Sequence, residues 1–165
     1  MLTTLMLTLS LSAAAPAAAP QKAPDFTGTW IEDEAARKIT PPPAPAPAGM
    51  PVLTGPPPSL IVTHTPQMLR TDRPWQHGVV THNYKLDGGE SANRNGANTL
   101  TTKSRWDGAK LVTEGSSYSV TSQGESTWRF KEIRWIDAKG SMVMETTNID
   151  EAGVAHVVLR VFRKK

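Results

Sequence analysis

The stretch DFTGTWI, residues 25–31, is the first part of the chain that can fold, because only an apolar leader and an Ala- and Pro-rich spacer precede it. It reads as a β-strand, apart from Gly28 two positions before Trp30. A Gly inside a strand marks a bend or a place where another segment approaches the backbone closely. We therefore expect a first strand over residues 26–32 that bends, or is closely approached, at Gly28.

Later segments read as short strands separated by turn residues. The Asp-Gly pairs at 87–88 and 107–108 and the Asn-Gly pair at 95–96 supply the positive φ of tight hairpin turns. The expected strands are residues 26–32, 60–64, 67–71, 78–86, 97–106, 110–120, 125–136, 142–149 and 154–162. Only EDEAARKI, residues 32–39, looks helical, and Pro41 limits it to about two turns.

Strands joined by short hairpins lie beside one another, which gives an antiparallel meander. Closing such a sheet into a barrel removes its exposed edges. We therefore predict one all-β domain over residues 25–165, an antiparallel up-and-down β-barrel of about 8–10 strands. The alternative is a two-sheet sandwich of immunoglobulin type, which needs several long connections. Here the long connection follows the first strand: a Pro-rich loop, residues 40–59, which holds 9 of the 14 Pro residues.

One predicted strand breaks the expected alternation of inward and outward residues. In STWRFKEIRWI, residues 126–136, the large apolar residues are Trp128 and Phe130, then Ile133 and Trp135, of opposite parity. A β-bulge near Lys131 or Glu132 would account for this shift.

The start of the chain resembles an export signal. Residues 1–17 combine a Leu- and Met-rich run with small residues, too short to span a bilayer, and residues 18–24 form an Ala/Pro spacer. No Lys or Arg precedes the apolar run, which counts against this interpretation. We expect cleavage before Ala18 and a periplasmic or secreted protein, without a membrane span once the signal is removed.

Composition excludes several kinds of chemistry. The chain of 165 residues contains no Cys, so it has no disulfide, thiolate nucleophile or Cys-bound metal. Its formal net charge is +3 with both signs interspersed, which argues against a nucleic-acid partner. His77 and His82 are five residues apart and would lie on opposite faces of a strand, so no metal site is expected.

Short motifs at both ends resemble known barrels. FTGTW at 26–30 resembles the first-strand motif of the calycins, the group of lipocalins and fatty-acid-binding proteins, and LRVFRKK at 159–165 resembles the last strand of the fatty-acid-binding proteins. The chain also resembles a set of small exported bacterial proteins of uncharacterised function. They share F-x-G-x-W, Y-x-L-D-G-x-E-x-x-N and W-D-G-x-x-L-V, which correspond here to residues 26–30, 84–93 and 106–112.

The resemblance implies roles for individual residues. Trp30 would cover the closed end of the barrel beside Gly28, with Arg160 or Arg163 stacked on its ring. By analogy with the fatty-acid-binding proteins, Arg160 would instead hold a ligand carboxylate, although Phe162 replaces the Tyr of that motif. The residues expected to contact a ligand are Arg160, Phe162, Trp128, Phe130 and Tyr84. The residues expected to close the barrel are Gly28, Trp30 and Arg160.

Three functions follow from these patterns. The first is binding of a small, largely apolar or amphipathic molecule inside the barrel, without cofactor or catalysis. The second is a structural or interaction module whose barrel is filled by its own side chains. The third, an enzyme using Glu90 or His82 at the rim, has the weakest support, because no G-x-S-x-G or paired-carboxylate pattern is present. Residues 87–98 are expected to form a polar loop over the barrel mouth.

Overall fold

A computed structural model describes residues 22–40, 58–75, 78–122, 124–149 and 153–165. Within these ranges the chain is antiparallel β-sheet with one 3-10 turn, η1 (Glu34–Ala36). The strands are β1 (Gly28–Glu32), β2 (Lys38–Thr40), β3 (Ser59–His64), β4 (Met68–Trp75), β5 (Gly78–Lys85), β6 (Glu90–Asn95), β7 (Asn98–Asp107), β8 (Lys110–Thr121), β9 (Gly124–Ile136), β10 (Met142–Ile149) and β11 (Ala155–Lys164).

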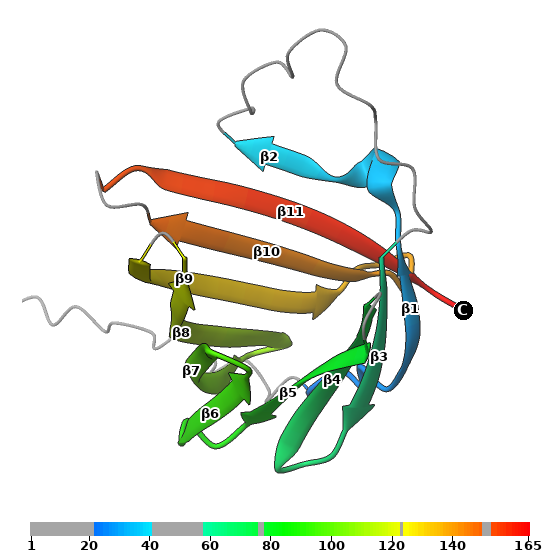
Figure 1. Cartoon of the computed structure of the whole chain (residues 1–165). Coiled ribbons are helices and arrows are strands. Elements are labelled where there is room, and N and C mark those ends of the chain that lie inside the picture. Colours follow the sequence, from blue (N-terminus) through cyan, green and yellow to red (C-terminus); the bar gives the residue numbers. More distant parts are fainter. Residues whose placement is uncertain (1–21, 41–57, 76–77, 123, 150–152) are drawn as a thin grey trace, which may run out of the picture.

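The strands curl into a nearly closed up-and-down barrel (Figure 1). Their spatial order is β5-β4-β3-β1-β11-β10-β9-β8-β7-β6, and β2 pairs with β11 outside this path. The first strand thus lies between β3 and the last strand, with Trp30 opposite both Leu60 and Lys164. This order confirms the predicted all-β barrel and excludes the two-sheet sandwich.

The barrel closes between β5 and β6 through side chains. Asn93 accepts a hydrogen bond at Oδ1 from the Asn83 N–H (2.7 Å) and donates one from Nδ2 to the Asn83 carbonyl (3.0 Å). Ser91 Oγ accepts a bond from the Lys85 N–H at 2.8 Å. Two inward-facing polar side chains of β6 therefore join it to β5, whereas the other neighbouring strands are joined by backbone hydrogen bonds.

A hydrophobic cluster fills one end of the barrel, next to the turns that follow β3, β5, β7 and β9. We call it the floor cluster; its members are Phe26, Trp30, Leu60, Val62, Leu69, Tyr84, Leu86, Leu111, Met142, Met144 and Phe162. Phe26 precedes β1 and Leu86 follows β5; the other members come from inward-facing positions of seven strands, because alternate residues of a strand face the same side. This burial is the main source of stability in a protein without disulfides.

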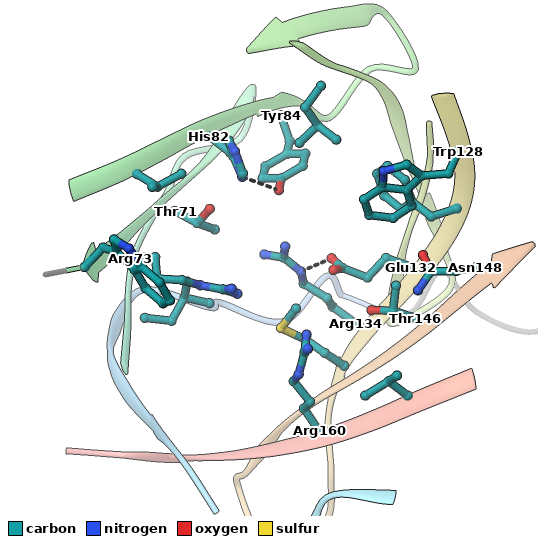
Figure 2. Close-up of a pocket in the computed structure, with 17 residues that line it drawn as sticks. Thr71, Arg73, His82, Tyr84, Trp128, Glu132, Arg134, Thr146, Asn148 and Arg160 are labelled. Atoms are coloured by element: carbon teal, nitrogen blue, oxygen red, sulfur yellow. Dashed lines mark hydrogen bonds and ion pairs between the residues drawn. The ribbon is translucent and has the colours of Figure 1, made fainter. Parts of the chain in front are cut away.

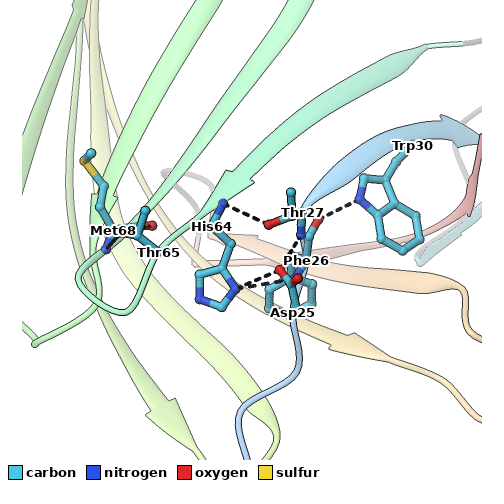
Figure 3. A network of polar contacts seen from close by, with 7 residues as sticks. All are labelled: Asp25, Phe26, Thr27, Trp30, His64, Thr65 and Met68. Carbon is cyan, nitrogen blue, oxygen red and sulfur yellow. Dashed lines mark hydrogen bonds and ion pairs between the residues drawn. The ribbon is translucent and has the colours of Figure 1, made fainter.

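The opening motif joins the floor cluster through ring and backbone contacts (Figure 3). The Trp30 indole N–H donates to the Phe26 carbonyl at 2.8 Å, and the Phe26 ring stacks on Trp106 with centroids 5.9 Å apart. Thr27 Oγ1 accepts a bond from the His64 N–H at 3.3 Å. Phe26 and Trp106 come from two different sequence motifs, so these motifs meet at the same place in the fold.

Gly28 allows the last strand to pass close by. Its φ is +141°, and a Cβ there would lie within 2.5 Å of the Lys164 side chain. The Lys164 ammonium lies 5.6 Å from the centre of the Trp30 ring. The cation over Trp30 is therefore Lys164. The expectation of Arg160 or Arg163 in this position is wrong, because Arg160 faces the barrel interior and Arg163 pairs with Asp33 at 2.6 Å.

The structure corrects three further expectations. Residues 32–39 form η1 and β2 instead of a helix, because residues 38–40 pair with β11. Residues 90–95, expected in a polar loop, form β6. The predicted bulge is absent from β9, whose pairing with β8 runs unbroken from Arg134 opposite Leu111 to Gly124 opposite Thr121.

The apparent change in which residues of β9 face inward arises from charged side chains in the barrel interior. Trp128, Phe130, Glu132 and Arg134 share the inward face, so charged residues occupy interior positions where apolar ones were expected. Trp135 lies on the outer face, where Lys110 Nζ is 5.1 Å from its ring centre.

The expected signal peptide, residues 1–17, and most of the Pro-rich loop lie outside the described residues. In the part of the chain that the structure covers, no helix is long and apolar enough to cross a bilayer.

Candidate functional site

The half of the barrel above the floor cluster contains an open cavity of about 410 Å³ (Figure 2). This volume lies within the range of roughly 300–1,000 Å³ usual for small-molecule pockets. Leu60, Tyr84 and Met144 belong both to the floor cluster and to the cavity wall, so they form the boundary between the two halves.

The deepest polar group in the cavity is an ion pair on β9. Arg134 Nε donates to Glu132 Oε1 at 2.5 Å, and the Arg134 guanidinium lies 5.1 Å from the centre of the Tyr84 ring. Arg134 is only 3% exposed, yet its Nη1 has no hydrogen-bond partner. A buried donor left unpaired costs about 1–3 kcal/mol or more when it is charged, so this atom is suited to an acceptor supplied from elsewhere.

Two further guanidinium groups face the same space. Arg73 comes from β4 and Arg160 from β11, and both line the cavity. Arg160 Nε is 3.7 Å from Glu32 Oε1, but Glu32 lies closer to Arg37, at 2.7 Å. For Arg73, no carboxylate among the described residues lies within ion-pair distance.

Burial and neighbouring charges shift several pKa values in the cavity. Burial raises the pKa of the Tyr84 phenol, so the hydroxyl stays protonated and can donate a hydrogen bond. Burial, together with Arg73 and Arg134, lowers the pKa of His82, whose Nδ1 lies 3.5 Å from the Tyr84 hydroxyl. Burial and then the nearby Arg73 and Arg37 lower the pKa of Arg160, against the opposite effect of Glu32.

The outer part of the cavity is apolar and aromatic. Trp128 and Phe130 are neighbours on β9, with ring centres 6.0 Å apart. Trp75, at the end of β4, is 68% exposed and Trp128 is 43% exposed. Exposed aromatic side chains at a cavity entrance can cover an apolar ligand at little entropic cost. The remaining apolar wall is formed by Val80, Leu100 and Val158.

The structure brings four of the five expected ligand-contacting residues together: Arg160, Trp128, Phe130 and Tyr84 line the cavity. Phe162 does not, because it is fully buried in the floor cluster. Gly28 and Trp30 lie at the floor, as the barrel-closing role requires, whereas Arg160 does not.

Sequence reasoning missed Arg73, Glu132 and Arg134. The alternation of β9 could have revealed two of them, because Glu132 and Arg134 lie on the same face of the strand as Trp128 and Phe130. The shift to Ile133 and Trp135 was attributed to a bulge instead. His82, weighed with His77 for a metal site and alone as a rim residue of an enzyme, lies on the cavity wall. Glu90 is at the start of β6, beside the floor-end turns, and does not line the cavity.

Within the residues that the structure describes, no group of three His, Asp or Glu side chains is arranged to hold a metal ion. His77 falls outside the described residues.

Comparison with known proteins supports the fold. No family model matches the sequence, and no curated protein is similar to it in sequence. Among solved structures, the chain resembles one titled "REP1-NXSQ fatty acid transporter", with a TM-score of 0.55 and 12% identity over 85% of this chain and 96% of that one. It also resembles apo lipid binding protein 8 of Caenorhabditis elegans, with a TM-score of 0.53 and 12% identity over 85% and 95% of the two chains. The fold is thus that of the fatty-acid-binding and lipid-binding barrels.

Proposed function

We propose that this protein binds a small amphipathic molecule inside the barrel, with an anionic head group at Arg134 and Arg160 and an apolar tail at the aromatic entrance. One observation supports this most directly: Arg134, a residue only 3% exposed, presents an unpartnered Nη1 beside the cavity. A carboxylate or similar anion would supply the missing acceptor and match the planar fork of a guanidinium.

The cavity is divided in a way that suits such a ligand. The buried Glu132–Arg134 pair lies against Tyr84 of the floor cluster, whereas Trp75, at the end of β4, and Trp128 are exposed. An apolar tail at these residues gains roughly 25 cal/mol for each Å² of surface removed from water. The similar barrels whose titles name fatty-acid transport or lipid binding agree with this arrangement.

The alternative is a barrel filled by its own side chains. The floor cluster fills one half in this way, but the other half keeps a cavity of about 410 Å³ lined by charged groups that do not pair fully with one another. The buried Arg134 Nη1 donor finds no acceptor among the protein's own side chains, which is unfavourable, so we favour the binding function. We propose binding without chemical change of the ligand.

The test begins with the delipidated protein and a fluorescent fatty acid. We expect saturable binding, displacement by decanoate and recovery of unchanged decanoate by mass spectrometry. Arg160→Gln should weaken decanoate binding about tenfold, since a charge-assisted hydrogen bond is worth roughly 1.5–3 kcal/mol. The matched control is Arg163→Gln, on the same strand but facing outward toward Asp33. A protein that binds none of several single-chain amphiphiles would overturn the proposal.

We also propose that the protein is exported and processed before Ala18. The support is the apolar run and small-residue tail of residues 1–17. The intact mass of the protein purified from its native host, in the periplasmic and the external fractions, tests this. A chain that keeps residues 1–17 in the cytoplasmic fraction would contradict it.

A further inference from the structure

The cavity wall carries more positive than negative charges. Three guanidinium groups, those of Arg73, Arg134 and Arg160, face one lining carboxylate, that of Glu132. Glu32 lies behind Arg160 but is already paired with Arg37 at 2.7 Å, so this second pair leaves the balance unchanged. Among the described residues, the wall therefore has two more positive than negative charges.

The three guanidinium groups also point toward one place. In Figure 2 the side chains of Arg73, Arg134 and Arg160 reach from three different strands toward the centre of the cavity, below the hydroxyls of Thr71 and Tyr84. Two like charges held near each other are unfavourable unless an anion lies between them. A single carboxylate has two oxygens and one charge, enough for Arg134 and one neighbour.

We propose that the head group bound here carries two negative charges and has the chemistry of a phosphate monoester. This inference rests on the proposed amphiphile binding and names its head group. A phosphate monoester carries about −1.5 to −2 charges near neutral pH and has three strong acceptor oxygens, one for each guanidinium. Arginine is suited to phosphate because it donates two parallel hydrogen bonds at once. Thr71 and Tyr84 line the same cavity and offer hydroxyl groups as neutral donors.

The decisive experiment compares ligands that share one tail. Calorimetry of the delipidated protein at pH 8 would use decyl phosphate, decyl methyl phosphate, decanoate and decanol. We expect decyl phosphate to bind at least about tenfold more tightly than decanoate and than the singly charged methyl diester, and decanol to bind most weakly. Inorganic phosphate, used alone, tests whether the tail is needed.

Variants test whether Arg73 binds the second negative charge of the head group. Arg73 is exposed and comes from the wall opposite β9, so Arg73→Gln should fold normally. We expect it to weaken decyl phosphate binding about tenfold and decanoate binding less than threefold. Arg70→Gln is the matched control, on the same strand but on the outer face beside Asp72, and should change neither affinity.

Each outcome bears on a different claim. Equal affinity for decyl phosphate and decanoate, or equal losses of both in Arg73→Gln, would overturn the dianion inference while leaving amphiphile binding intact. Tight binding of inorganic phosphate without any gain from the decyl tail would support the head group and overturn the proposed function. Absence of binding by all five compounds would overturn both.

Discussion

At the scale of single residues, the buried ion pair of Glu132 and Arg134 carries a desolvation cost. Both are buried, and each is the other's nearest charged partner. Removing Arg134 leaves the buried Glu132 carboxylate without its partner, so Arg134→Met should lower the free energy of unfolding by about 3–5 kcal/mol. Urea denaturation followed by tryptophan fluorescence measures this loss.

The double variant Glu132→Leu/Arg134→Met is the informative control. Replacing a buried ion pair by apolar residues of similar volume is often neutral or stabilising, so most of the lost stability should return. Ligand binding should not return with it, because the head-group site is gone. A double variant as unstable as the single one would show that the pair stabilises the fold through its specific geometry.

His82 should make the barrel less stable as the pH falls. Burial first, then Arg73 and Arg134, hold the pKa of His82 below its ordinary value of about 6.5. Between that value and the lower folded pKa, the unfolded chain binds more protons, so stability falls as the pH falls through this window. Thermal melting from pH 8 to pH 5 should show a smaller decrease for His82→Gln than for the unmodified protein. Equal decreases would contradict the assignment.

At the scale of elements, the junction of β5 and β6 is the least reinforced part of the barrel. It depends on Asn93 and Ser91 bonding to the backbone of β5. Asn93→Ala removes two hydrogen bonds and leaves both Asn83 backbone groups unpaired, at about 1–3 kcal/mol. We expect faster amide exchange in β5 and β6 and unchanged exchange in β10 and β11. Uniform acceleration across all strands would instead indicate global destabilisation.

The same junction shows how far the sequence could predict these elements. The turns at Gly88, Gly96 and Gly108 were predicted correctly, and so was the hairpin of β7 and β8, because such turns are determined by local backbone chemistry. β6 was missed because its inward residues are Ser91 and Asn93, which a search for apolar alternation does not detect. Their function is visible only once β5 lies beside them.

The candidate site was predictable only where a local sequence motif revealed it. Arg160 was singled out through its resemblance to a known motif, and the structure places it in the cavity. Arg73 and Arg134 belong to other strands, and only the closure of the barrel brings them near Arg160. The short strand β2 was mistaken for helix, because its edge pairing with β11 is not encoded in local propensity.

At the scale of the whole molecule, the two halves of the barrel divide stability and binding between them. Phe26 is fully buried in the floor cluster and stacks on Trp106, so Phe26→Ala should cost about 3–5 kcal/mol. Trp128 is half-exposed at the entrance, so Trp128→Ala should cost less than about 1 kcal/mol but weaken amphiphile binding several-fold. Denaturation and ligand titration of both variants test this division, which fails if Trp128→Ala proves as destabilising as Phe26→Ala.

The pairing of the first strand with the last has a consequence for the order of folding. Residues 30–32 of β1 find their partners at residues 162–164 of β11, so the barrel cannot close until β11 has been synthesised. Such distant pairing raises the contact order, which slows folding through the entropy lost on joining the ends. The hairpins from β7 to β11 can form early, because their partners are adjacent in sequence. Docking of Trp30 against Lys164 is then the late event that joins β1 to β11 and converts an open, curved sheet into a barrel.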